Sequence, residues 1–317
     1  MNEIAGLLRE AQQVVLVAHV NPDADALGST LATAIAVESL GIKVGVTFPD
    51  DPFVVPNVLR FLPRQDLLID PARAQSPVVV SMDASSPDRI GRLLPMGQAA
   101  QTFIAIDHHA SFVPFADINY CDATQPATGI IALDLIDALG VPLTTDIATC
   151  LYAAVTSDTG SFRYPATTPN SMRVAARLME TGIDFAGIAK VLFDTKSREF
   201  IALQSQVMKD LEVRDVDGLT VAIARVPKSA RDALDIPFTD AEALIDSVRT
   251  LDGVDVAVVL KQDDHGNWRV STRSMGAADV GAVCTGLGGG GHRLAAGFTG
   301  GDDVTETLDR LLGALVA

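Results

Sequence analysis

The sequence has few of the features that mark disulfide-stabilised or membrane proteins. Its 317 residues include only three cysteines, Cys121, Cys150 and Cys284, with no CxxC pair. Such a sparse, odd set favours reduced thiols over a disulfide framework. No apolar run reaches the roughly 18 residues that a membrane-spanning helix requires. The N-terminal segment lacks the basic start and apolar core of a signal peptide, so we expect a cytoplasmic protein without membrane association.

Positive charge and aromatic residues are also scarce. The 24 Lys and Arg residues face 40 Asp and Glu residues, for a formal net charge of −16. This balance disfavours a protein that coats long nucleic acid. It does not exclude small anionic substrates, because a metal site and a few arginines can reverse the charge locally. One tryptophan and three tyrosines offer little surface on which a long single strand could stack.

The first half of the chain alternates short apolar runs with helical patterns. The apolar runs are typical of buried parallel strands; they are Val14–Ala18, Val44–Phe48, Val78–Met82 and Phe103–Ile106. Helical spacing is found in Ala26–Leu40, Gly129–Leu139, Asp146–Val155 and Ser171–Glu180. This alternation predicts an α/β domain with a mainly parallel sheet and helices on both of its faces.

The pattern changes after about residue 185. We expect a first domain over residues 1–185, a helical linker over 186–209 and a smaller domain over 210–317. Two hairpin signals mark the last of these segments. They are Leu211–Asp215 with Leu219–Val226, and Val254–Lys261 with Trp268–Arg273. The smaller domain is therefore predicted to be α+β, with an antiparallel or mixed sheet.

Acidic and histidine residues follow the predicted strands of the first half. In chain order they are His19, Asp23 and Asp25 after the first strand, Asp83 after the third, and Asp107, His108 and His109 after the fourth. The carboxyl ends of parallel strands meet at one edge of a sheet, where ligands bind. Asp158 follows a predicted helix and could close the site from another side.

The types of these residues predict a metal centre. Imidazole and carboxylate together suit Mn²⁺, Fe²⁺, Co²⁺ or Zn²⁺ better than Ca²⁺. The carboxylates exceed what one ion needs, and one shared acid would match two ions about 3.5–4 Å apart, an arrangement used on phosphate esters. Taken singly, each residue is better interpreted as a loop histidine, a turn residue or a helix cap. Their joint placement favours the metal centre.

The second half contains a glycine-rich stretch, Gly288–Phe298. Gly289, Gly290 and Gly291 would let backbone amides approach an anion closely, and a helix that began after them would add its dipole. His292 lies beside these glycines, and Arg273 is a candidate phosphate clamp. A glycine run alone is more typical of a flexible surface loop, but the apolar residues that follow it favour burial.

These segments resemble the DHH phosphoesterase superfamily. The matching segments are Val15–Ser29, Val79–Asp83, Asp107–His109 and Ser157–Tyr164. The first departs from the family pattern at Ala24, where relatives commonly have glycine. The glycine-rich stretch, with Arg273, is similar to the DHHA1 domain that accompanies the DHH domain. In the order and size of its DHH-like and DHHA1-like segments, the chain resembles the nanoRNase and pAp phosphatase subgroup. This subgroup includes bacterial cyclic-di-AMP phosphodiesterases.

The resemblance implies roles for individual residues. One ion would be bound by His19, Asp23 and Asp83, and the other by Asp25, Asp83, His108 and Asp158, with Asp83 shared. The catalytic residues would be Asp83, His109 as a candidate proton donor, and Asp107 as the residue that orients a neighbouring histidine. The substrate would be bound by Arg163, Arg273, Gly289, Gly290, Gly291 and His292. Arg163 is equally well interpreted as a surface arginine.

The function that the resemblance implies is hydrolysis of short nucleotides by a two-metal phosphodiesterase or phosphatase. The substrates would be cyclic-di-AMP, pApA, nanoRNA oligoribonucleotides or pAp, and the protein a homodimer. Mn²⁺ is the expected metal, with Mg²⁺ or Co²⁺ as alternatives. A RecJ-like single-strand exonuclease is disfavoured because RecJ enzymes carry further domains. A pyrophosphate or polyphosphate hydrolase is disfavoured by the glycine motif, and a non-catalytic nucleotide sensor by the full set of metal ligands.

Overall fold

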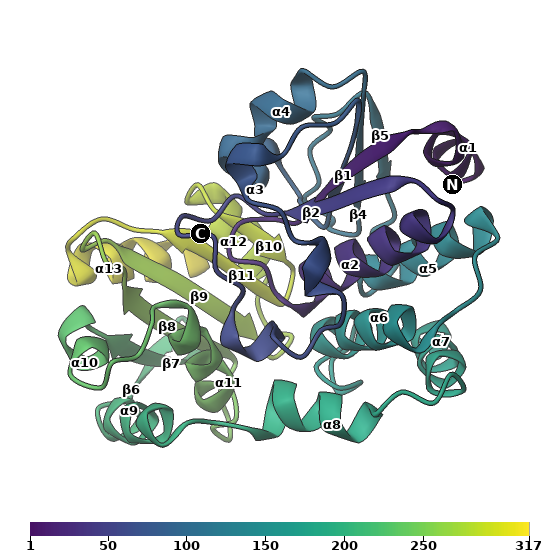
Figure 1. Ribbon diagram of the computed structural model, residues 1–317. Coiled ribbons are helices and arrows are strands. Elements are labelled where there is room, and N and C mark those ends of the chain that lie inside the picture. The colour runs from purple at the N-terminus through teal and green to yellow at the C-terminus, as the bar shows by residue number, and fades with distance from the viewer. Residues whose placement is uncertain (317) are drawn as a thin grey trace. The chain divides into compact units, whose positions relative to one another are not determined.

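The computed structural model describes residues 1–316. The chain divides into two compact units, which we call unit 1 (Met1–Thr195) and unit 2 (from Lys196 onward). Each unit has a sheet of its own, and each is described by itself (Figure 1). The predicted boundaries at residues 185 and 210 stay a prediction. No helix within residues 1–316 combines the length and the apolar character needed to cross a membrane.

Within the described residues, unit 1 contains a five-stranded sheet in the order β2-β1-β3-β4-β5, and every neighbouring pair is parallel. The strands are β1 (Gln13–Val17), β2 (Lys43–Thr47), β3 (Val78–Met82), β4 (Thr102–Asp107) and β5 (Ile118–Cys121). The first four match the predicted apolar runs within one residue at each end. β5, which lies at the edge of the sheet, was not among the predicted strands.

Helices cover both faces of this sheet, which confirms the predicted α/β class. One face packs against α1 (Asn2–Glu10), α2 (Ala24–Ser39) and α5 (Thr128–Leu139), and α6 (Thr145–Asp158) packs against α2 and α5. The other packs against α3 (Pro87–Ile90), η4 (Gly91–Leu93) and α4 (Leu94–Gln98). Unit 1 also contains η1 (Asn57–Leu59), η2 (Gln65–Leu67), η3 (Pro71–Arg73), α7 (Pro169–Met179), α8 (Phe185–Ala189) and a π-helical turn, η5 (Lys190–Asp194).

Helix α2 is buried along most of its length and packs closely against α6. Every residue from Ala24 to Val37 is buried. A Cβ atom at Gly28 would lie 2.5 Å from the carbonyl oxygen of Cys150 in α6, so only glycine allows the backbones to come this close. The packing holds the N-terminal end of α2 near the C-terminal end of α6. Asp25 and Asp158 lie at those two ends.

The described residues of unit 2 contain a mixed sheet, one of the two kinds predicted, with the strand order β10-β11-β9-β8-β7-β6. The strands are β6 (Glu212–Val216), β7 (Leu219–Val226), β8 (Val256–Gln262), β9 (Trp268–Ser274), β10 (Gly290–His292) and β11 (Ala295–Thr299). Among these six strands, all within residues 196–316, only β7 and β8 pair in parallel. One face packs against α9 (Arg198–Lys209), α10 (Lys228–Asp232), η6 (Thr239–Ala243) and α11 (Leu244–Val248). The other face packs against α12 (Val280–Gly286) and α13 (Val304–Leu315).

The glycine-rich stretch differs from the expectation in one respect. No helix begins directly after the glycines; instead β10 and β11 form an antiparallel hairpin. The glycines are explained by close packing, because a Cβ at Gly289 would lie 2.1 Å from the carbonyl oxygen of Gly297. Gly291 has a φ of +137°, which L-residues with side chains rarely adopt. The described hairpin therefore does not supply the helix dipole that was expected at this position from the sequence.

Candidate metal centre

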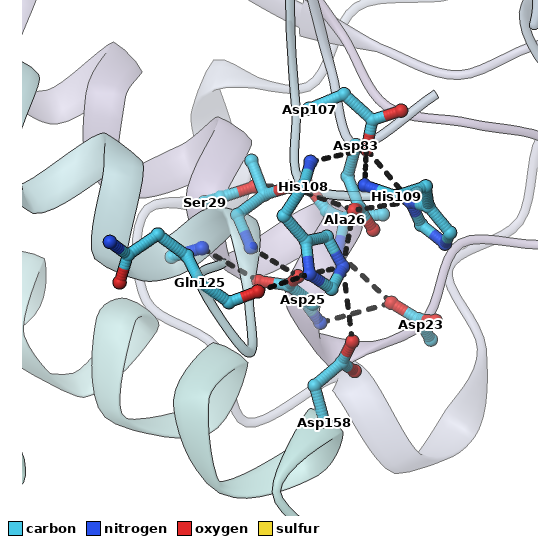
Figure 2. Close-up of polar contacts among 12 residues, drawn as sticks. Asp23, Asp25, Ala26, Ser29, Asp83, Asp107, His108, His109, Gln125 and Asp158 are labelled. Carbon is cyan, nitrogen blue, oxygen red and sulfur yellow. Dashed lines mark hydrogen bonds and ion pairs between the residues drawn. The ribbon is translucent and has the colours of Figure 1, made fainter. Parts of the chain in front are cut away.

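The carboxyl ends of β1, β3 and β4 bring the acidic and histidine residues of unit 1 together (Figure 2). Asp83 follows β3 and lies at the middle of the group. Its backbone N–H donates to the carbonyl oxygen of Ile106 at 2.9 Å, and its φ is +61°, in the left-handed region. A non-glycine residue in this conformation is uncommon and marks local strain, which is found preferentially at functional sites.

His19, Asp23 and Asp83 form the first group of potential ligands. His19 Nε2 lies 3.8 Å from Asp23 Oδ2 and 3.6 Å from Asp83 Oδ2. His19 Nδ1 lies 2.9 Å from the carbonyl oxygen of Val20, which can only accept a hydrogen bond. The proton is therefore placed on Nδ1, and Nε2 presents its lone pair to the carboxylates.

Asp25, His108 and Asp158 form the second group, on the other side of Asp83. His108 Nε2 lies 3.6 Å from Asp25 Oδ2, 3.5 Å from Asp83 Oδ1 and 3.4 Å from Asp158 Oδ2 (Figure 2). Its Nδ1 lies 3.1 Å from the carbonyl oxygen of Gln125, which fixes the ring orientation in the same way. Asp83 thus offers one oxygen to each histidine, as a shared ligand would.

The N-terminus of α5 supports this cluster, a role that was not predicted from the sequence. Thr128 N–H and Gly129 N–H donate to the two oxygens of Asp25 at 2.7 and 2.8 Å. The Thr128 hydroxyl donates to Asp83 Oδ1 at 2.8 Å. A Cβ at Gly129 would lie 2.6 Å from the Cβ of Ala154, so a larger residue would push α5 away from α6. A residue that contributes main-chain N–H groups has no side-chain signature in a sequence.

Asp107 organises the histidine pair. Its Oδ1 accepts hydrogen bonds from His109 Nδ1 at 2.7 Å and from the backbone N–H groups of His108 and His109 at 2.7 and 3.2 Å. The contact holds the His109 ring with its Nε2 directed away from Asp107. His109 Nδ1 also lies 3.7 Å from Asp83 Oδ1, which places this ring beside the metal-ligand candidates.

The electrostatics of the cluster favour a bound cation. Burial and the charge of Asp158 raise the pKa of Asp25 well above its ordinary value, and burial with the charge of Asp25 does the same for Asp83. Burial opposes the protonation of His108, but Asp158 and Asp25 outweigh it and raise the pKa of His108 to about 9. Asp25 and Asp83 are 0% and 2% exposed. Crowded buried carboxylates with raised pKa values fit a site for divalent cations, which would neutralise them.

The predicted substrate-binding residues lie in both units. In unit 1, Arg163 Nε donates to the carbonyl oxygen of Gly160 at 2.7 Å, and its guanidinium lies 5.9 Å from the ring centre of Phe193. In unit 2, Arg273 lies on β9 and donates to the carbonyl oxygen of Thr272 at 3.0 Å. Gly290, Gly291 and His292 form β10, next to β11.

Two family models match the chain. The model for the DHH family, N-terminal domain, matches residues 13–155, and the model for the DHHA1 domain matches residues 218–317. The bifunctional oligoribonuclease and PAP phosphatase NrnA of Thermus thermophilus is 32% identical, over 99% of this chain and 93% of that protein. The chain belongs to the DHH family.

This DHH protein is also similar to a second sequence relative and to a solved structure. The cyclic-di-AMP phosphodiesterase GdpP of Geobacillus thermodenitrificans is 27% identical, over 90% of this chain and 44% of that longer protein. The crystal structure of an exopolyphosphatase-related protein from Bacteroides fragilis has a TM-score of 0.87 and 23% identity, and covers 99% of this chain and 95% of that one. This last similarity shows that the two proteins share a fold.

Proposed function

We propose that this DHH protein is a two-metal phosphoesterase that hydrolyses short nucleotides. The observation that carries the proposal is the cluster around Asp83, in which two groups of imidazole and carboxylate ligands share one acid. Its members are buried except for Asp23, which is exposed, and Asp158, which is partly exposed. His19, Asp23 and Asp83 would hold one ion. Asp25, Asp83, His108 and Asp158 would hold the other.

The residues around the cluster prepare it for this chemistry. Two bound divalent ions would lower the pKa of a water molecule and neutralise charge on the phosphoryl oxygens. Thr128 and Gly129 hold Asp25 and Asp83 in fixed orientations through three hydrogen bonds, two to Asp25 and one to Asp83. Asp107 orients His109, whose Nε2 we propose as the proton donor to the leaving oxygen.

The substrate class is supported by the relatives and by unit 2. The relatives' names refer to oligoribonucleotides, PAP and cyclic-di-AMP. We propose cyclic-di-AMP, pApA, nanoRNA and pAp as candidate substrates, and Mn²⁺ as the metal, with Mg²⁺ or Co²⁺ as alternatives. Arg163, Arg273, Gly289, Gly290, Gly291 and His292 would bind the nucleotide. We further propose domains at 1–185 and 210–317 with a helical linker between them, a homodimer, and a cytoplasmic location.

A kinetic panel tests the proposal. Turnover of pApA, cyclic-di-AMP, pAp and a short oligoribonucleotide would be measured with Mn²⁺, Mg²⁺ and Co²⁺ in turn. Bis(p-nitrophenyl) phosphate would serve as a small ester that needs the metal centre alone. We expect metal-dependent hydrolysis of at least one nucleotide and of the small ester. An absence of turnover at every metal concentration would contradict the enzymatic proposal, and hydrolysis of pyrophosphate alone would contradict the substrate class.

A further inference from the structure

Unit 2 contains a buried lysine to which the proposed function gives no role. Lys261 lies on β8 and is 1% exposed. Its ammonium group donates to the Ser271 hydroxyl at 3.0 Å and forms an ion pair with Glu242 of η6. The Ser271 hydroxyl in turn donates to Glu242 Oε1 at 2.8 Å. Two donors therefore converge on one carboxylate, an arrangement that equally suits the oxygens of a phosphate group.

The register of the sheet places this cluster on the same face as the predicted nucleotide-binding residues. Lys261 pairs with Arg269, and Ser271 lies between Arg269 and Arg273 on one side of β9. Arg273 pairs with Ala295 of β11, and Ala295 pairs with His292 of β10. Directly paired residues point to the same face of a sheet. Lys261 and Ser271 thus lie on the same face of the sheet as Arg273 and His292.

Lys261 lies among three other cationic side chains. Arg269 pairs with Asp263, and Arg231 pairs with Asp264. Within residues 1–316, no carboxylate forms an ion pair with Arg273. Burial and the charges of Arg273, Arg269 and Arg231 lower the pKa of Lys261 to about 7. Burial and these like charges therefore disfavour the charged form of Lys261.

The two partners of the ion pair differ in how easily they move. The Lys261 side chain is enclosed, with its Nζ 5.5 Å from the ring centre of Phe238. The Glu242 side chain is 53% exposed and can rotate into solvent. An incoming anion would displace Glu242 while Lys261 and Ser271 stay in place. The donors Lys261 and Ser271 are therefore fixed in place, and a movable carboxylate covers them. This is the arrangement expected of an anion-binding site that a side chain of the protein itself occupies.

We propose that Lys261 and Ser271 form a subsite for a terminal phosphate of the nucleotide, and that Glu242 occupies this subsite when no ligand is bound. The subsite rests on the proposed function and makes it more specific. It favours linear nucleotides with a terminal phosphate, such as pApA, over cyclic dinucleotides, which have none. The phosphate bound here is not the one that is hydrolysed.

Calorimetric binding of two diadenylates tests the subsite. Both carry an uncharged methylphosphonate linkage that resists hydrolysis, and only one carries a 5′-phosphate. For the full-length, metal-loaded protein we expect the phosphate to tighten binding by about 10-fold or more, the range of a charge-assisted hydrogen bond. Lys261→Met should remove most of this gain. Glu242→Gln should enlarge it by about 3-fold or more, because the competing charge is gone.

Two control variants and one separate measurement sharpen the test. Two variants should leave the gain in affinity from the 5′-phosphate unchanged. Lys228→Met removes a lysine that pairs with Asp232 at the surface, and Asp240→Asn removes a different carboxylate of η6. If Glu242 and Lys261 only stabilise the fold, Glu242→Gln will lower the unfolding temperature and leave the gain unchanged, which overturns the subsite. An unchanged gain in Lys261→Met also overturns it. Turnover of natural pApA is measured separately, so failure of the proposed function is distinguishable.

Discussion

The Thr128 hydroxyl donates a hydrogen bond to Asp83 Oδ1 at 2.8 Å and so joins the start of α5 to the residue at the middle of the metal centre. Both side chains are buried. Thr128→Val keeps the shape of the side chain but loses this hydrogen bond. We expect kcat/KM on bis(p-nitrophenyl) phosphate to fall by about 10-fold, with weaker Mn²⁺ binding. Thr128→Ser retains the hydroxyl and should stay near wild type; equal losses in both variants would contradict the role.

Asp83 should be indispensable to turnover. Asp83→Asn removes the charge that both proposed ions would share, and asparagine tolerates the left-handed conformation of this residue. We expect activity on every substrate to fall below about 0.1% of wild type. Because the charge of buried Asp83 is unfavourable without metal, the metal-free variant should unfold at a higher temperature than the metal-free wild type at pH 8. Appreciable activity in this variant would overturn the two-metal assignment.

Metal removal should make stability depend on pH in a defined direction. The pKa values of Asp25 and Asp83 lie above the 3.8 of an unfolded aspartate, so the folded state binds more protons than the unfolded state in this range. His108, raised from 6.5 to about 9, acts in the same direction. Lys261, lowered from 10.5 to about 7, acts in the opposite direction above pH 7 and offsets only part of the fall. Stability of the chelated protein should fall as pH rises from about 4 toward 9, with a loss of about 5 °C or more in Tm between pH 5 and pH 8.

Added Mn²⁺ supplies the check on this pH dependence. By neutralising the carboxylates it should restore most of the lost stability at pH 8 and much less at pH 5. The Asp25→Asn variant, with one buried charge fewer, should show a smaller fall in Tm without metal. A chelated protein that becomes more stable from pH 5 to pH 8 would show that the raised pKa values do not control its stability.

His292 should separate substrate binding from chemistry. His292 lies on β10 of unit 2 and belongs to neither of the two proposed ligand groups. For His292→Ala we expect KM for pApA to rise by about 10-fold, the value of one or two hydrogen bonds, and turnover of bis(p-nitrophenyl) phosphate to be unchanged. Steady-state kinetics on the two substrates would measure this. Equal loss on both would mean that unit 2 contributes more than nucleotide binding.

The bounds of helices and strands with a strong apolar pattern could be predicted closely from the sequence. β3 was predicted to the residue, and α2 begins two residues before its predicted start because Asp23 caps it. β5 was missed because its residues alternate between half-buried and exposed at the sheet edge, so it has no continuous apolar run. β10 was missed because glycines dominate it, and their strand conformation depends on pairing with β11.

The ligand candidates could be predicted from the sequence because parallel strands end at one edge of the sheet. The hydrogen bonds that hold these side chains in place could not be predicted. Asp25 is held by the N–H groups of Thr128 and Gly129, and His19 by the carbonyl oxygen of Val20. These are backbone groups, which any residue type supplies. The pairing of Lys261 with Glu242 was equally hidden, because it depends on how η6 packs against the sheet of unit 2.

The two amide groups that bind Asp25 have a practical consequence. They belong to α5, yet their hydrogen-bond acceptor is a proposed metal ligand in α2. Charge on Asp25 sets the strength of both hydrogen bonds, so the nuclear magnetic resonance signals of the Thr128 and Gly129 amides should shift when metal binds. Their rates of deuterium exchange would report metal loading residue by residue, without an added probe and without any substrate.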